Sequence, residues 1–151
     1  MTPKEYLSQI EKLSIIIKQK KEESRELKEL CLCAGGIDYS KDKIQASAGD
    51  AGFENMIEKI IELDSKINNL ISIYAELKNK IINEIQQLNN PTYVKILYKR
   101  YVEYKTLNQI AKEMNYTYDW IKHVHGYALQ EFGKKTPKDT RRHQKTPKDT
   151  F

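Results

Sequence analysis

Apolar residues recur at alternating intervals of four and three in the middle of the chain, which is the spacing of a helix that packs along one seam. The stretch from about Phe53 to Asn89 keeps this spacing through Met56, Ile60, Leu63, Ile67, Leu70, Tyr74, Leu77, Ile81, Ile85 and Leu88. At 1.5 Å per residue, such a helix would be on the order of 55 Å long. A helix of this length is expected to need a packing partner along its seam.

An N-terminal helix can supply part of that partner. Thr2, Pro3 and Glu5 form a helix-start signature, with Thr at the cap and Pro at the first helical position. The seam that follows is polar in its middle and runs through Tyr6, Ile10, Leu13, Ile17, Lys20, Ser24, Leu27 and Cys31. Residues 34–52 have the Gly, Ser and Asp content of a connector. The pattern predicts an antiparallel helical hairpin or coiled-coil arm over residues 1–90, and self-association of the second helix is the competing arrangement.

A different pattern begins at Asn90-Pro91, where proline ends one helix and suits the first position of the next. The apolar stripe Val94, Leu97, Tyr98 and Tyr101 then predicts a support helix. Residues 91–133 are therefore expected to form a separate three-helix head.

Two short capped helices are predicted next. Thr106 and Gln109 form a capping box, and Asn115 tolerates the positive φ at which the first helix ends. Thr117 can cap the second helix, with Asp119 favourably placed in its first turn. The apolar positions are Leu107, Ile110, Ala111 and Met114 in the first helix, and Ile121, Val124, Ala128 and Phe132 in the second. The pair has the pattern of a helix-turn-helix, although an ordinary helical hairpin shares much of that pattern.

The second of these helices is expected to expose Tyr118, Asp119, Lys122 and His123 when its apolar face is buried. A phenol, a carboxylate, an ammonium and an imidazole can all hydrogen-bond to base edges from the first turns of a recognition helix. Trp120 can either seal the core of the head or lie along a DNA backbone.

The run TYDWIKHV at 117–124, followed by Ala128-Leu129, resembles region 4 of bacterial sigma factors. The longer run LYKRYVEYKTLNQIAKEMNYTYDWIKHVHGYALQEF, with the helical segment before it, resembles the RinA/ArpU-like phage transcriptional regulators. The resemblance implies that Tyr118, Asp119, Lys122 and His123 read DNA and that Thr106 and Gln109 contact its backbone. Tyr104 departs from region 4 sequences, many of which have Gly in that turn.

The distribution of charge also indicates that the C-terminal part of the chain binds nucleic acid. Residues 91–151 contain 13 Lys/Arg and 6 Asp/Glu, whereas residues 1–90 contain 13 and 15. A basic segment gains affinity for nucleic acid by releasing counterions from phosphates. We expect Lys105, Lys112 and Thr117 to contribute further DNA contacts. Residues 134–151, in which KTPKDT occurs twice, are predicted to be a flexible basic tail that is either solvated or adds phosphate contacts.

Several other classes of protein are not supported by the sequence. His123 and His125 are two residues apart on a helix and face different sides, so no metal site is expected. No phosphate loop, nucleophile elbow or acid/base pair is present, so neither an enzyme nor a cofactor is expected. The longest apolar run, Ile15 to Ile17, is far too short to cross a membrane. Cys31 and Cys33 do not make a disulfide framework, and a cytoplasmic protein is expected.

The hypothesis is a sequence-specific, phage-type transcriptional regulator, expected to be an activator, that binds double-stranded DNA through the head. RNA polymerase is a candidate partner because sigma region 4 binds both, and a homodimer through the coiled coil is a further candidate. The chain would then assist the host sigma factor and not replace it. Two alternatives stay open, namely an oligomeric DNA-packaging protein such as a small terminase subunit, and a head that binds only protein.

Overall fold

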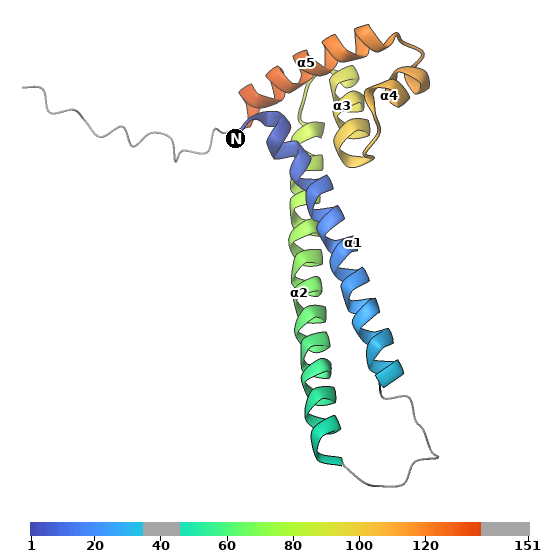
Figure 1. Cartoon of the computed structure of the whole chain (residues 1–151). Helices are drawn as coiled ribbons and strands as arrows, with labels where there is room; N and C mark the ends of the chain where they lie inside the picture. The colour runs from blue at the N-terminus through green and yellow to red at the C-terminus, as the bar shows by residue number, and fades with distance from the viewer. Residues whose placement is uncertain (35–45, 137–151) are drawn as a thin grey trace, which may run out of the picture. The chain divides into compact units, whose positions relative to one another are not determined.

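The computed structural model describes the backbone of residues 1–34 and 46–136, and all of the regular structure in these ranges is helical. The elements are α1 (Pro3–Ala34), α2 (Ala46–Gln86), α3 (Pro91–Leu97), a π-helical turn η1 (Tyr98–Val102), α4 (Leu107–Met114) and α5 (Tyr118–Lys135) (Figure 1). The expected all-α class is therefore confirmed. Residues 35–45 of the predicted connector and residues 137–151 of the predicted tail lie outside the described ranges.

Two predicted boundaries need correction. α2 begins at Ala46, inside the segment predicted as a connector. Alanines at 46, 48 and 51 favour the helix, and the one glycine among them, at 49, costs only about 1 kcal/mol. α5 continues to Lys135, so the first two residues of the predicted tail are helical.

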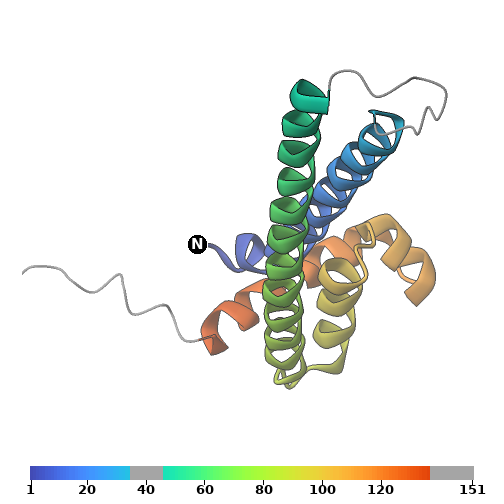
Figure 2. The same cartoon turned by 90° about the horizontal axis from the view of Figure 1, so that it is seen from below.

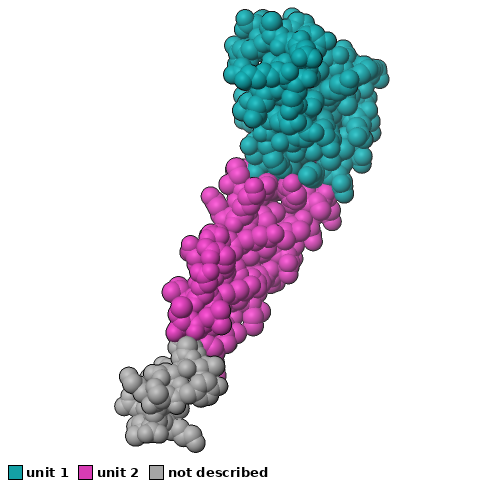
Figure 3. All heavy atoms as spheres, turned by 90° about the vertical axis from the view of Figure 1, so that its right-hand side faces the viewer, with its two compact units in different colours: residues 1–11, 78–151 teal, residues 12–77 magenta. Residues whose placement is uncertain are grey.

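The chain divides into two compact units (Figure 3). Unit 1 comprises residues 1–11 and 78–151, and unit 2 comprises residues 12–77. α1 and α2 each contribute to both units. The predicted boundary at residue 90 therefore lies within unit 1, because the first turns of α1 and the last turns of α2 belong with the helices that follow.

Unit 2 consists of parts of α1 and α2 that run in opposite directions beside each other (Figures 1 and 2). Ile17 and Ile67 are buried in its seam. The polar seam position Ser24 is only 3% exposed, and its hydroxyl donates to Asp64 Oδ1 at 2.6 Å. Oδ2 of the same carboxylate forms an ion pair with Lys28 Nζ at 2.9 Å. Ser24 and Lys28 together hold the pKa of Asp64 below its usual value.

Unit 1 also buries side chains of the long helices and of α5, namely Leu7 and Ile10 of α1, Ile81 and Ile85 of α2, Leu88 just after α2, and Phe132 of α5. Tyr6 stacks on Phe132 with ring centroids 6.2 Å apart and donates its hydroxyl to Glu84 Oε2 at 2.8 Å. A Cβ added to Gly133 would lie 2.8 Å from Pro3 Cγ. Glycine therefore permits α5 to approach the start of α1 this closely.

The support helix is not a continuous α-helix. Its buried residues are Ile96, Leu97, Tyr101 and Val102. Ile96 and Tyr101 are five positions apart, and so are Leu97 and Val102. In an α-helix a residue five positions on is rotated by about 140°, so a regular helix could not bury both members of a pair on one face. The π-helical turn, whose N–H of Glu103 bonds to the carbonyl of Tyr98, brings them together. The predicted stripe therefore missed Ile96 and Val102, while Val94 and Tyr98 are only half-buried.

Candidate nucleic-acid interface

α4 and α5 pack with α3 around a small apolar core within unit 1. The core consists of Ile96, Ile110, Ala111 and Ile121, with Leu107, Met114 and Val124 packed against it. All four apolar positions predicted for α4 are among them. Because these side chains face inward, the opposite faces of α4 and α5 are left to solvent.

The predicted caps fix where each helix begins. Thr106 Oγ1 accepts from the N–H of Gln109 at 3.2 Å, and Gln109 Oε1 accepts from the N–H of Thr106 at 2.9 Å. Thr117 Oγ1 accepts from the N–H of Trp120 at 3.3 Å. Both capping predictions are confirmed. The three side chains are exposed, but their oxygen atoms already bind the protein's own backbone.

The turn between the helices depends on Asn115, which has φ 57° and ψ 41° and ends α4 in the left-handed conformation. Its N–H bonds to the carbonyl of Ala111. The turn before α4 also contains a residue with positive φ, Tyr104, where φ is 59°. A left-handed residue other than Gly or Asn is disfavoured by contact between its Cβ and the following carbonyl. The departure noted in the sequence therefore lies at a position where Gly would be less strained.

Tyr118, Asp119, Lys122 and His123 are all exposed on the first two turns of α5. His123 Nδ1 lies 2.6 Å from the carbonyl oxygen of Asp119. A carbonyl can only accept, so Nδ1 carries the proton and donates it. Nε2 of His123 is then left as the atom that can accept from, or donate to, another molecule.

The cations of the head are less available than their number suggests. Lys99 and Lys105 both pair with Glu113 at 2.8 Å, and Lys105 also pairs with Glu103 at 2.9 Å. Hydrogen bonds with Glu113 and Glu103 raise the pKa of Lys105 above its usual value. Of the residues predicted to contact DNA, Lys105 is thus already paired with carboxylates of the protein itself. Lys112 and Lys122 are exposed and have no ion pair within the described ranges.

An exposed aromatic pair was not recognised from the sequence. Trp120 neither enters the core nor lies alone, because its ring stacks on Tyr116 with centroids 3.9 Å apart. The two rings are 38% and 47% exposed. Tyr116 lies in the turn before α5 and Trp120 lies in the first turn of that helix, so helical spacing in the sequence gave no signal for this contact. The pair gives this end of the head a flat aromatic surface beside Tyr118.

His125 has a different role from its neighbour His123. Its Nε2 lies 3.0 Å from the Tyr101 hydroxyl, and the two rings stack with centroids 5.7 Å apart. Burial, followed by the charges of Arg100 and Lys4, lowers the pKa of His125 to about 4. Burial also raises the pKa of Tyr101 to about 12. His125 is therefore a neutral packing residue between η1 and α5.

Within the described residues, no group of three or more His, Cys, Asp or Glu side chains is arranged to hold a metal ion. None of the described helices combines the length and the apolar content needed to cross a membrane. Comparison with protein-family models, with curated proteins and with solved structures finds no match to this chain.

Proposed function

We propose that this chain is a sequence-specific DNA-binding protein and acts as a phage-type transcriptional regulator. In this proposal, α4 and α5 are the two helices of a helix-turn-helix, and α5 enters the major groove by its N-terminal turns. Tyr118, Asp119, Lys122 and His123 contact base edges, while Thr106, Gln109 and Lys112 lie near the phosphates. The arm formed by α1 and α2 sets the distance to a second copy or to RNA polymerase.

The observation that carries the proposal is the turn at Asn115 between two capped helices that share one core. The buried face of α5 packs in this core, and four hydrogen-bonding side chains are exposed on the first helical turns of α5. Hydrogen-bonding side chains at the start of a well-supported helix are what base readout requires. Lys122 and Lys112 add positive charge at this surface, and neither forms an ion pair within the described ranges.

The test is selection of binding sites from a random duplex library with the full chain at near-physiological salt. A defined motif is expected with the unmodified protein. The Lys122→Ala/His123→Ala variant should lose or alter one position of that motif, with a cost of about 1–3 kcal/mol per lost base contact.

Lys59→Ala is the matched control for charge. Lys59 is exposed on α2 within unit 2, so its loss removes one positive charge without touching α5. It should leave the motif and its affinity unchanged. Binding that has no sequence preference, or that weakens equally in both variants, would refute base readout by α5.

A second candidate function is an oligomeric assembly or DNA-packaging protein, and one observation favours it. Ile57, Ile61, Ile71 and Ile73 of α2 are between 37% and 64% exposed. Exposed aliphatic side chains along one long helix suit contact with another copy. Sedimentation at micromolar concentration separates the two functions, because a regulator that reads paired half-sites is expected to be a dimer and a packaging ring needs many copies.

A further inference from the structure

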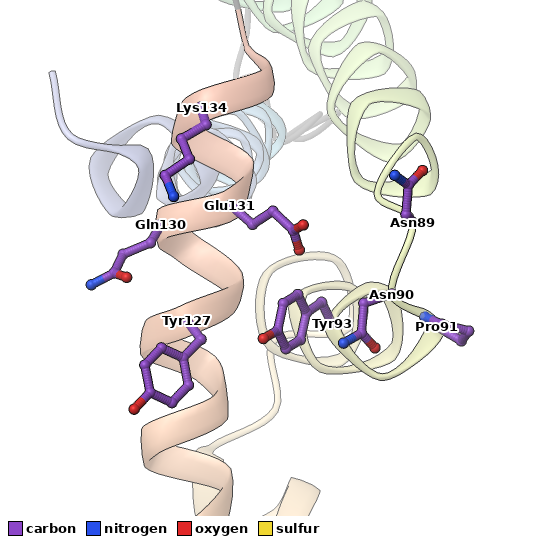
Figure 4. A pocket seen from close by; sticks show the side chains of 8 residues that line it. All are labelled: Asn89, Asn90, Pro91, Tyr93, Tyr127, Gln130, Glu131 and Lys134. Carbon is purple, nitrogen blue, oxygen red and sulfur yellow. The ribbon is translucent and has the colours of Figure 1, made fainter.

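A cleft of about 670 Å³ lies in unit 1 between one face of α5 and the turn that leads into α3 (Figure 4). Its walls include Asn90 and Tyr93 from the α3 side and Tyr127, Glu131 and Lys134 from α5. The volume is within the range of about 300–1,000 Å³ that is usual for small-molecule sites. None of these residues belongs to the caps of α4 and α5 or to the turn between them, and Asn90 caps α3.

Glu131 is the one residue in the described ranges that leaves a buried side-chain oxygen without a hydrogen-bond partner. The atom is Oε2, and the side chain extends from α5 toward Asn90 and Tyr93 (Figure 4). Burying a carboxylate oxygen is destabilising unless a donor binds it. A ligand that donates hydrogen bonds and carries positive charge would remove that cost.

Lys134 does not supply the missing charge, although it lines the same cleft. In Figure 4 its side chain and that of Glu131 extend from different sides of α5. The described residues contain no ion pair between them. The amide oxygen of Asn90 is likewise committed, because it accepts from the N–H of Thr92 at 3.0 Å.

The chemistry of the walls selects the kind of cation. A divalent metal ion prefers several oxygen ligands and usually more than one carboxylate, and Glu131 is the only carboxylate among the described residues that line the cleft. Tyr93 lies on the side of α5 toward which Glu131 extends (Figure 4). Its ring provides a face on which a planar guanidinium stacks better than a compact, strongly hydrated ammonium. A guanidinium can also bind a carboxylate through two N–H groups at once.

We propose that this cleft binds a guanidinium group, with Glu131 as its hydrogen-bond acceptor and the ring of Tyr93 beside it, while Tyr127 lines the outer part of the cleft. The group is an arginine side chain, and it belongs either to this chain or to another molecule. The proposal is independent of DNA binding, since it uses none of the four side chains assigned to base readout.

The test is a titration of the full chain with N-acetyl-L-arginine amide, followed by backbone amide NMR. Saturable shifts are expected at Tyr93, Tyr127 and Glu131, with a dissociation constant on the order of millimolar. Glu131→Gln preserves shape and should weaken binding about tenfold or more, because the acceptor loses its charge. Glu58→Gln, an exposed carboxylate in unit 2, changes the net charge equally and should have no effect.

Two further comparisons sharpen the assignment. N-acetyl-L-lysine amide should bind several-fold more weakly than the arginine probe if ring stacking contributes. Lys134→Ala should strengthen binding several-fold, because a like charge at the cleft is removed.

The source of the guanidinium is separated by the Arg141→Gln/Arg142→Gln variant of the full chain. Tighter probe binding in this variant than in the unmodified chain would mean that the chain's own arginine occupies the cleft. Equal binding would assign the cleft to an arginine of another molecule. The proposal is overturned if neither protein shows saturable binding, which would leave water as the partner of Glu131, or if Glu131→Gln binds the probe as tightly as the unmodified chain.

Discussion

The two compact units use their apolar residues in opposite ways. Of the 16 buried hydrophobic residues in the described ranges, only Ile17 and Ile67 belong to unit 2. The large hydrophobic residues exposed in unit 2 are aliphatic except for Phe53, whereas those exposed in unit 1 are tyrosines and a tryptophan except for Met1. Unit 1 therefore defines its own fold and presents aromatic rings with polar atoms. Unit 2 leaves aliphatic surface that favours association with another apolar surface.

The largest expected effect comes from truncating the core of unit 1. Ile121→Ala should lower the free energy of unfolding by about 2–4 kcal/mol, since Ile121 is fully buried and its cavity would be enclosed by three helices. The matched change in unit 2, Ile67→Ala, should cost less because a seam between two helices can close around the deleted atoms or admit water. Urea unfolding followed by circular dichroism measures both. Equal costs would abolish the distinction between the units.

The second-largest expected difference between the units is their loss of stability at acidic pH. His125 has a pKa of about 4 in the folded protein against an ordinary 6.5, so the unfolded chain takes up a proton at a pH where the folded chain does not. Stability is therefore lost as the pH falls from about 6.5 toward 4, by roughly 1–2 kcal/mol once partial solvent exposure is allowed for. In unit 2, the lowered pKa of Asp64 means that its stabilising contacts are lost only at lower pH.

Hydrogen exchange at pH 7 and pH 5 measures the two responses separately. Amides of α5 should exchange faster relative to intrinsic rates at pH 5, and those of α1 beyond residue 12 should not. His125→Gln should remove the difference between the two pH values. His123→Gln, which alters an exposed imidazole on the same helix, should retain it. Loss of the difference in both variants would count against burial of His125 as the cause.

A smaller effect is expected at the turn between α4 and α5. Asn115→Ala should lower stability by about 0.5–1 kcal/mol, because alanine lacks the tolerance of asparagine for the left-handed conformation. Asn115→Gly should be neutral or slightly stabilising. Thermal unfolding of the two variants compares them directly. If alanine and glycine behave alike, the backbone at 115 is not left-handed in solution.

The smallest effect is expected in the polar part of unit 2. Ser24→Ala removes the hydroxyl that donates to Asp64, but Lys28 still pairs with the same carboxylate. The cost should be less than about 1 kcal/mol, measured by urea unfolding as for Ile67→Ala. A cost as large as that of Ile121→Ala would show that unit 2 depends on this hydrogen bond as strongly as unit 1 depends on its core.

Local signals in the sequence determined the most accurate predictions. The caps at Thr106 and Thr117 and the left-handed end at Asn115 depend on side chains within four residues, and all three agree with the structure. Every predicted seam position of α1 and α2 from Tyr6 to Leu88 is buried or half-buried. Such features follow from spacing and short-range hydrogen bonds, which a single sequence displays.

Features that arise from tertiary packing were not predictable in the same way. The π-helical turn lets Tyr101 and Val102 be buried on the same side as Ile96 and Leu97. An α-helical pattern of apolar residues would not indicate this arrangement. The pairing of Lys105 with Glu103 and Glu113 depends on how a loop folds over α4. The cleft at Glu131 combines residues about 40 positions apart, and sequence spacing on α5 alone did not indicate it.

The π-helical turn has a consequence for how this segment tolerates changes in length. Residues Tyr98 to Val102 include one residue more than an α-helical ladder of the same rise would need. Deleting one residue between Leu97 and Tyr101 would bring the pairs Ile96/Tyr101 and Leu97/Val102 from five to four positions apart. An ordinary α-helix keeps residues four positions apart on one face. Tyr101 and Val102 would therefore stay on the buried face, and His125 would keep its stacking partner. The π-helical turn thus accommodates one extra residue without changing which side chains face the core.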